Sequence, residues 1–299
     1  MIGRAPEPSR FGCLTLTTDY GYGSGFVGTL HAVAFGIAPS LRVIDLDHDV
    51  PAHDVRLGAL RLERFMRVAP RGVHVGVVDP GVGGTRRPLA IEIGGHAFVG
   101  PDNGLLVWAA EACAPAGMRG AAAGVDGMSV GGGAGVDGMR AVVLDRADYW
   151  LEHRSSTFDG RDIFVPAAAH LARGATLNQV GTEIDPMTLV RLERPIVRVR
   201  GGRETDLEVL QVDRFGNVQL SGDSRTVTAL GLRTGDRVEV STTRSSPVPA
   251  TYVTTFSDVS QGTAAVLIDS DGCLALSVNC GRADVLLDTE TQIVTIKRG

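Results

Sequence analysis

The sequence lacks long hydrophobic runs, signal-like segments and any excess of positive charge. No stretch of about 18 uninterrupted apolar residues occurs, so no membrane-spanning helix is expected. The formal net charge of −5 argues against a nucleic-acid-binding protein, which normally carries a basic face. Residues 1–10 contain Pro and polar residues but no apolar signal region, so the cytoplasm is the expected compartment.

Patterns of metal ligands are missing as well. The four cysteines (Cys13, Cys113, Cys273 and Cys280) include no Cys-x-x-Cys pair, and the seven histidines are scattered. Neither residue type has the spacing of a zinc site. We therefore expect reduced, mostly buried thiols, no metal site and no cofactor.

What the sequence does contain is the composition of an ordinary globular protein. Of its residues, 43% are hydrophobic and 21% are charged. Its length of 299 residues is sufficient for one large domain or two medium ones. In the first hundred residues, strand patterns alternate with helical spacing, with Ser24 as the expected N-cap of the first helix and Pro39 as its stop. Strands are expected at 11–18, 41–46 and 72–78, and helices at 26–37 and 54–65.

This alternation predicts crossover units and therefore an α/β domain with a mainly parallel sheet. Ligands of such sheets bind beyond the carboxyl ends of the strands, where Asp19 and Asp79 fall. Residues 114–139 are dominated by Gly, Ala and Met, and we expect a flexible surface loop there. A strand at 140–144 and a helix at 162–173 follow.

After Pro195 the pattern changes to short alternating runs separated by turn residues, which is typical of a small β-barrel or sandwich. The boundary is expected between Val180 and Pro195. The sequence thus predicts an α/β domain over 11–185 and a smaller, barrel-like all-β domain over 195–299.

Several polar motifs punctuate these elements. In the first domain they are TTDYG at 17–21, VDPGVG at 78–83 followed by Arg86 and Arg87, GPDNGLL at 100–106 and STFDGRD at 156–162. In the second they are DRFGN at 213–217, DSDG at 269–272 and VN at 278–279. In this order and at these separations, the set resembles the S-adenosylmethionine hydroxide adenosyltransferases, relatives of the fluorinases and chlorinases. The likeness runs from about residue 13 to the end, apart from the Gly-rich segment.

The resemblance implies a hydrolase that attacks the ribose C5′ of S-adenosyl-L-methionine with water and releases adenosine and L-methionine. It also implies a homotrimer in which a neighbouring subunit completes a substrate site lying between the domains. Its small-molecule substrate is bound without a cofactor.

Each expected substrate contact has a position in this chain. By resemblance, Asp19 holds the ribose diol, since one carboxylate can accept from both hydroxyls. The other implied contacts are Asp213 to the methionine ammonium, Ser270 near its carboxylate, Asn217 to the adenine edge, Phe215 as an apolar wall and Asn279 through its backbone. Alternatively, Asp19 caps the next helix, Asp213 and Asn217 are turn residues, and Phe215 belongs to a core.

The implied nucleophile site is Asp79, Arg86 and Asp159, which would hold the attacking water. Related hydrolases have a histidine at the position of Asp159, and an aspartate is a weaker base near neutral pH. Asp79 and Asp159 could share the task. His53 or His153 could instead replace the missing histidine, although proximity in sequence does not establish proximity in space.

Two further departures concern substrate contacts. Ser24 stands where the family often has an acid, and Asp271 follows Ser270 where the halogenases have an arginine.

The aspartate at position 159 also makes a non-catalytic binder or sensor of S-adenosylmethionine or adenosine a rival hypothesis. A halogenase is disfavoured because the segment 89–100 runs into Pro101 without the halogenases' insertion, and because Asp79 would repel a halide. A calcium-dependent nucleoside hydrolase is disfavoured because no short loop carries several acids.

Overall fold

The computed structural model describes residues 10–115, 137–289 and 292–299. The predicted Gly-rich loop therefore lies almost entirely outside the described residues. The described chain forms two compact units, one ending at Leu192 and the other spanning Glu193–Gly299.

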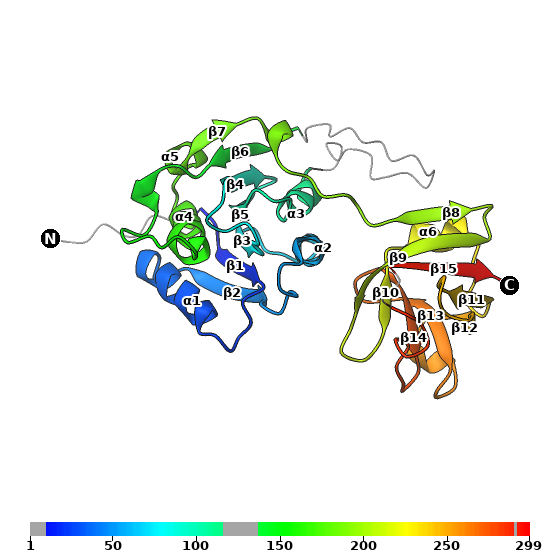
Figure 1. Ribbon diagram of the computed structural model, residues 1–299. Coiled ribbons are helices and arrows are strands. Elements are labelled where there is room, and N and C mark those ends of the chain that lie inside the picture. The colour runs from blue at the N-terminus through cyan, green and yellow to red at the C-terminus, as the bar shows by residue number, and fades with distance from the viewer. Residues whose placement is uncertain (1–9, 116–136, 290–291) are drawn as a thin grey trace. The chain divides into compact units, whose positions relative to one another are not determined.

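The first unit is built on a seven-stranded sheet with the order β2-β1-β3-β5-β4-β6-β7 (Figure 1). Its strands are β1 (Cys13–Thr18), β2 (Arg42–Asp47), β3 (Val73–Val77), β4 (Pro88–Ile93), β5 (His96–Pro101), β6 (Arg140–Val143) and β7 (Thr182–Ile184). The predicted strands at 11–18, 41–46, 72–78 and 140–144 are confirmed as β1, β2, β3 and β6.

The prediction of a mainly parallel sheet is wrong, because the sheet is mixed. Strands β2, β1, β3 and β5 are parallel, whereas β4, β6 and β7 join through antiparallel pairs. The cause lies at Gly94 and Gly95, whose φ angles of 59° and 83° form a two-residue turn between β4 and β5. Such a turn can join only antiparallel neighbours, since a parallel connection needs a long crossover.

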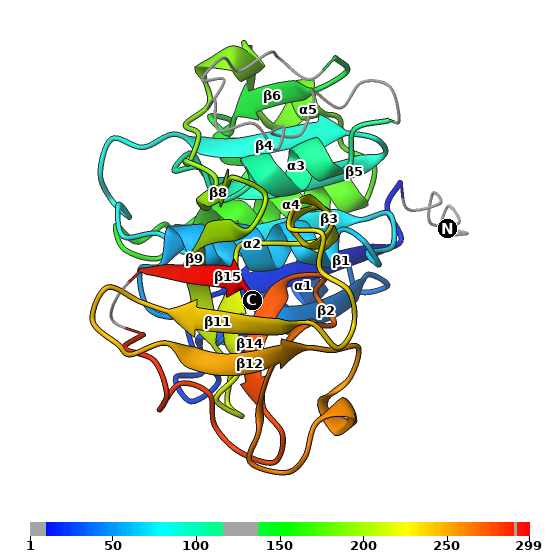
Figure 2. The same ribbon diagram turned by 90° about the vertical axis from the view of Figure 1, so that its right-hand side faces the viewer.

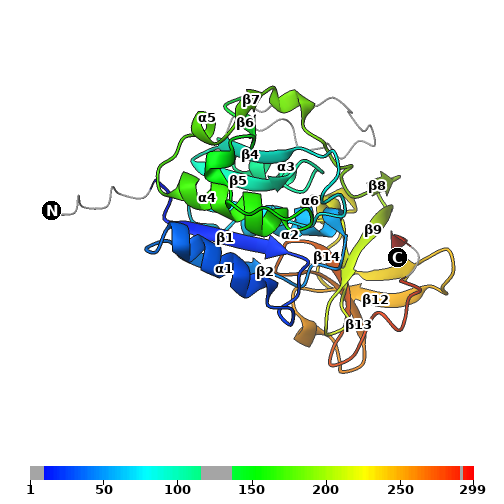
Figure 3. The ribbon, with the colours of Figure 1, turned by 60° about the vertical axis from the view of Figure 1, so that its left-hand side comes forward.

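Helices cover both faces of this sheet. Helices α1 (Phe26–Ile37) and α4 (Val165–Ala172) lie side by side over one face (Figure 3). Helices α2 (Val55–Phe65) and α3 (Val107–Ala112) cover the other (Figure 2). The core between the sheet and the α1–α4 layer includes Leu14, Leu16, Leu30, Val75 and Phe164. The short helices of this unit are η1 (Ala147–Tyr149), η2 (Gly160–Phe164), α5 (Leu177–Val180) and η3 (Pro186–Thr188).

The expected helices at 26–37 and 54–65 are confirmed, but Ser24 is not the N-cap of the first. Gly25 holds that position in a left-handed conformation, with φ of 73°. The Ser24 hydroxyl instead donates to the Tyr20 carbonyl at 3.1 Å. Asp54 does cap α2, accepting from the Leu57 backbone N–H at 2.9 Å.

The second unit is a closed seven-stranded barrel, in agreement with the predicted β domain. Its strands run in the order β10-β14-β13-β12-β11-β15-β9, and pairing of β9 with β10 closes the ring; β8 pairs with β9 outside it. The core includes Leu207, Val240, Val266, Leu276 and Ile296. The elements are β8 (Val197–Arg200), β9 (Glu204–Val212), β10 (Val218–Leu220), α6 (Ser224–Ala229), β11 (Arg237–Ser241), β12 (Val248–Tyr252), η4 (Phe256–Asp258), β13 (Ala264–Ile268), β14 (Leu274–Val278) and β15 (Ile293–Arg298).

A buried histidine on β3 couples the stability of the first unit to pH. His74 is fully buried, with Nδ1 2.9 Å from Thr15 Oγ1 and Nε2 3.0 Å from His96 Nδ1. Burial, and then the neighbouring His96, lower the pKa of His74 to about 3. The folded protein therefore keeps this ring neutral, whereas the unfolded chain takes up a proton at the ordinary value of 6.5.

We predict that the free energy of unfolding falls as the pH drops from 6.5 towards 3, because only the unfolded state gains this proton in that range. His74→Gln keeps a polar group towards Thr15 without the titration, so its stability should fall less between about pH 7 and about pH 4.5. Aspartates with a lowered pKa, such as Asp162, lose their contribution only below the ordinary value of 3.8. Urea denaturation at both pH values measures the difference, and equal losses in the two proteins would contradict the prediction.

Candidate active site

A cavity of about 270 Å³ opens in the first unit, beyond the carboxyl ends of β1 and β3. Three of the predicted site residues, Asp19, Asp79 and Asp159, line it. The remaining lining residues are Tyr20, Phe26, His53, Val77, Val82, Thr157, Phe158 and Gly160. The strand-end aspartates thus meet as the topology of parallel strands requires.

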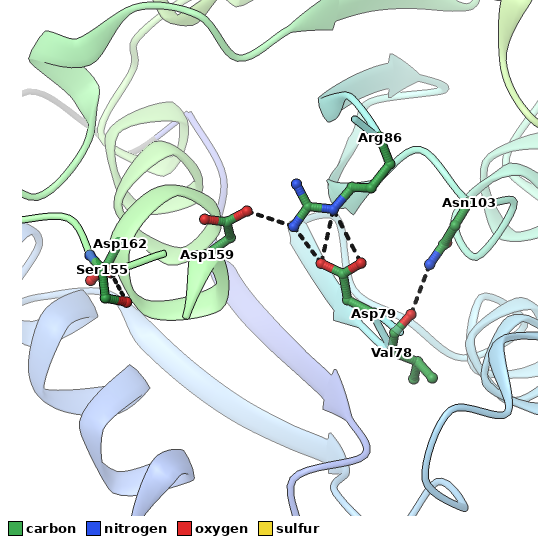
Figure 4. Close-up of polar contacts among 7 residues, drawn as sticks. All are labelled: Val78, Asp79, Arg86, Asn103, Ser155, Asp159 and Asp162. Atoms are coloured by element: carbon green, nitrogen blue, oxygen red, sulfur yellow. Dashed lines mark hydrogen bonds and ion pairs between the residues drawn. The ribbon is translucent and has the colours of Figure 1, made fainter. Parts of the chain in front are cut away.

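Arg86 lies between two of these carboxylates (Figure 4). Its Nε is 3.1 and 3.0 Å from the two Asp79 oxygens, and one terminal nitrogen is 2.5 Å from Asp79 Oδ2 and from Asp159 Oδ2. The side chains of Asp79 and Asp159 are each 5% exposed and that of Arg86 is 12% exposed. The predicted nucleophile-site residues are therefore brought into one buried cluster, which carries a formal charge of −1.

The electrostatics of this cluster keep Arg86 charged. Burial alone would lower the pKa of its guanidinium, but hydrogen bonds and ion pairs with Asp79 and Asp159 outweigh burial and raise the pKa above its usual range. The guanidinium is thus a permanent donor that fixes both carboxylates.

Local backbone contacts place Asp79. The side-chain amide of Asn103 donates to the Val78 carbonyl at 2.8 Å and so holds the end of β3 (Figure 4). In the following loop Gly83 has φ of 76°, and a Cβ there would lie 2.7 Å from the Ser156 carbonyl oxygen. Glycine therefore lets this loop approach the segment that carries Asp159.

Asp159 directly precedes η2, which is a π-helix that continues into α4. This rare geometry is frequent at functional sites. The helix predicted for 162–173 is therefore present, but its first turn belongs to the π-helix η2 and only the rest is the α-helix α4. Buried Asp162 fixes the preceding loop by accepting from the Ser155 backbone and hydroxyl, at 2.8 and 2.9 Å, and from Arg161 at 2.6 Å. Burial would raise the pKa of Asp162, but these bonds outweigh it and lower the pKa.

Asp19 follows β1 and faces the cavity from another side. Its Oδ2 accepts the His53 backbone N–H at 3.0 Å, so it caps neither α1 nor α2, and the helix-cap alternative is wrong. The loop behind it is tied to His48, whose Nδ1 lies 2.7 Å from Thr18 Oγ1 and whose carbonyl accepts from Gly21 at 2.8 Å.

The aromatic wall of the cavity was not predicted from the sequence. Tyr20, Phe26 and Phe158 meet edge to face, with ring centroids 5.1 to 5.7 Å apart. Burial raises the pKa of Tyr20, and the negative charges of Asp19, Asp79 and Asp159 raise it further, so its phenol stays protonated. The available signal was the position of Tyr20 and Phe158 next to Asp19 and Asp159 in their motifs.

The remaining predicted contacts lie on the barrel. Asp213 Oδ1 accepts from the backbone N–H groups of Phe215 and Asn217, at 2.8 and 2.9 Å, and its Oδ2 accepts the Asn217 amide at 2.7 Å. Asp213 and Asn217 therefore stabilise the turn between β9 and β10, which was the alternative role considered for them. Phe215 is 67% exposed and does not belong to the core.

Ser270 is exposed in the turn between β13 and β14. The Asn279 amide donates to the Val259 carbonyl at 2.8 Å.

Family models for two domains match this chain. The SAM hydroxide adenosyltransferase N-terminal domain matches residues 14–181, and the corresponding C-terminal domain matches 207–294. The chain belongs to the SAM hydroxide adenosyltransferase family.

Individual relatives agree with this assignment. An (R)-S-adenosyl-L-methionine hydrolase of Salinispora arenicola is 42% identical over 92% of this chain and 93% of its own length. A fluorinase of Nocardia brasiliensis is only 25% identical over 89% of this chain and 90% of its own length. The crystal structure of an uncharacterized conserved protein from Thermotoga maritima superposes with a TM-score of 0.80 and 29% identity, covering 95% of this chain and all of the other.

Two further features of this family member concern membranes and metals. In the part of the chain that the structure describes, no helix has the length and apolar character needed to cross a bilayer. Within the same ranges, no group of three or more His, Cys, Asp or Glu side chains is arranged to hold a metal ion. The absence of a cofactor requirement stays a prediction.

The contact between Tyr20 and Gly160 gives a test of the cavity wall. A Cβ at residue 160 would lie 2.4 Å from the Tyr20 hydroxyl oxygen but 3.6 Å from the nearest Phe158 atom. We predict that Gly160→Ala costs about 1–3 kcal/mol of unfolding free energy through overpacking. The cost should shrink when Tyr20→Phe removes the hydroxyl. Denaturation of both single variants and the double variant measures this coupling, and strictly additive effects would contradict the proposed contact.

Proposed function

We propose that this chain hydrolyses S-adenosyl-L-methionine to adenosine and L-methionine. The observation that carries the proposal is the Asp79–Arg86–Asp159 cluster in the cavity of a chain 42% identical, over nearly its whole length, to a named hydrolase of this substrate. The family membership supports the substrate class, and the cluster supports the reaction.

The chemistry asks little of the protein beyond a placed nucleophile, because the sulfonium is already a good leaving group. The water oxygen forms a bond to C5′ while the C5′–S bond breaks. The electron pair of the C5′–S bond stays on sulfur, so the sulfonium becomes the uncharged thioether of methionine. One water proton departs, so the products are adenosine, methionine and a proton. Asp79 and Asp159 would hold the water in line with the C5′–S bond, which lowers the entropic part of the barrier.

Water is a better nucleophile here than a halide. The cluster of Asp79, Arg86 and Asp159 carries a formal charge of −1 in a site where each carboxylate is 5% exposed. A halide would be repelled by this charge, whereas the cationic sulfonium would be attracted. The charge therefore favours binding of the substrate and disfavours halogenation.

Asp19 would bind the ribose diol, because its Oδ1 and the remaining lone pairs of Oδ2 can accept two hydroxyls. On the barrel, Asn217 and Phe215 would meet the adenine, and Asn279 would contribute its backbone. Asp213 would bind the methionine ammonium through the remaining lone pair of Oδ2, since the turn bonds use both positions of Oδ1 and one of Oδ2. Ser270 would lie near the carboxylate.

We also propose that the protein acts as a homotrimer in the cytoplasm, with each site completed by a neighbouring subunit. The exposure of large apolar side chains on the barrel supports an association of this kind, since Phe215 is 67% and Val285 is 74% exposed. The backbone N–H groups of Ala283 and Asp284 both donate to the Gly216 carbonyl, so the segments that carry Phe215 and Val285 are adjacent. Exposed apolar side chains on adjacent segments are typical of interaction sites.

The direct test incubates the purified protein with S-adenosyl-L-methionine, with and without chloride, and separates the nucleosides by chromatography. We expect adenosine and methionine in equal amounts, independent of chloride. Binding measured by calorimetry without adenosine would contradict the proposal and favour a non-catalytic sensor. In that case Asp159→His, which restores the residue of related hydrolases, should create turnover.

Two variants separate the chemistry from substrate binding. Asp79→Ala removes a ligand of the attacking water and should lower kcat by about 10²-fold or more with a smaller effect on KM. Asp19→Ala removes the ribose contact and should raise KM at least tenfold. Full activity of Asp79→Ala would refute the nucleophile site, and unchanged substrate affinity of Asp19→Ala would refute the diol contact.

A further inference from the structure

The proposed hydrolysis releases a proton that some group must accept, and the two buried carboxylates are poorly placed to do so. Asp79 and Asp159 share one guanidinium nitrogen at 2.5 Å each. Protonation of either would weaken its ion pair with Arg86 and leave the guanidinium with less compensation in a mostly buried position. These carboxylates can hold the water, but the structure ties their charges to Arg86.

The other titratable groups that line the cavity, Tyr20, Asp19 and His53, differ in whether they are free to accept a proton. Tyr20 stays protonated because its pKa is raised, so it can only donate. Asp19 is engaged by the His53 backbone and is assigned to the ribose. Among the described residues that line the cavity, His53 is the remaining side chain with a nitrogen that can accept a proton.

The backbone of His53 is held in an unusual conformation. Its φ of 70° is in the left-handed region, and within the described ranges only Cys280 shares such an angle among non-glycine residues. The Asp19 carboxylate secures it by accepting its N–H at 3.0 Å, and Asp54, the next residue, is fixed as the α2 cap. A strained conformation of this kind persists only where surrounding contacts enforce it, and such positions cluster at functional sites.

We propose that His53 is the general base of this reaction and takes over the role of the histidine that related hydrolases have at position 159. This inference rests on the proposed hydrolase function. The neutral imidazole accepts the proton that water loses as its oxygen bonds to C5′, directly or through a second water. Because His53 is solvent-exposed at the cavity, it can then release the proton to bulk water.

Charged and titratable groups near His53 come from several loops. Asp19, whose Oδ2 accepts the His53 backbone N–H, and Tyr20 follow β1, and Asp54 is the next residue in the loop of His53. Asp79 and Asp159 line the same cavity, and both bind Arg86. His53 therefore shares one cavity with the carboxylates that would hold the water.

The test uses variants that respect the backbone. His53→Asn removes the base while keeping a residue that tolerates positive φ, and His53→Gly leaves room for added imidazole. We expect His53→Asn to lower kcat by about 10²–10⁴-fold, with little change in KM or in the Kd for substrate. The wild-type kcat should fall at low pH as the base becomes protonated, and this acid limb should disappear in the variant. Imidazole should partly restore the kcat of His53→Gly.

The matched control is His153→Asn, because His153 is an exposed histidine that does not line the cavity. It should keep the wild-type kcat and pH profile. If the wild type is active and His53→Asn is equally active, the role of His53 is overturned while the proposed hydrolysis stands. Loss of kcat in His53→Asn with an unchanged acid limb and no imidazole rescue has the same meaning. A wild type that binds the substrate without releasing adenosine would overturn the proposed function and this inference with it.

Discussion

The buried ion pairs of Arg86 are the interaction on which the site depends. One guanidinium joins the end of β3, through Asp79, to the start of η2, through Asp159, although the two carboxylates come from distant parts of the chain. Buried charges of this kind are stable only when each has a partner. The loop after β3 and the loop before η2 must therefore be built to meet at Arg86, which is what the positive φ at Gly83 and the anchoring by Asp162 accomplish.

The same constraint determines the charge of the cavity. Two carboxylates and one guanidinium leave one negative charge on side chains that are only 5 to 12% exposed, so this charge is weakly screened. A cationic sulfonium substrate compensates that charge on binding and loses its own charge in the reaction. The site therefore suits the substrate of the hydrolases better than it suits an anionic nucleophile.

Much of this arrangement could be predicted from the sequence, and the exceptions have physical reasons. Parallel strands β1 and β3 bring Asp19 and Asp79 to one edge of the sheet, so a strand pattern was sufficient to place both. The pairing of Arg86 with Asp159 depends on tertiary structure and was accessible only through resemblance to a family. The mixed sheet was missed although Gly94 and Gly95 carry a strong hairpin signal. The left-handed conformation of His53 could not be predicted, because histidine adopts it only occasionally and the contact with Asp19 that holds it is tertiary.

An aspartate at position 159 changes more than one side chain, because a histidine there would pair differently with Arg86. With a neutral histidine, Asp79 alone would balance the guanidinium and the cluster would carry no net charge. With Asp159, the cluster carries a formal negative charge and has a carboxylate, bound to Arg86, in place of an imidazole. The substitution thus exchanges proton acceptance for a stronger attraction of the sulfonium. In the proposed mechanism another group in the same cavity accepts the proton, and His53, whose backbone N–H is held by Asp19, is the histidine that lines this cavity.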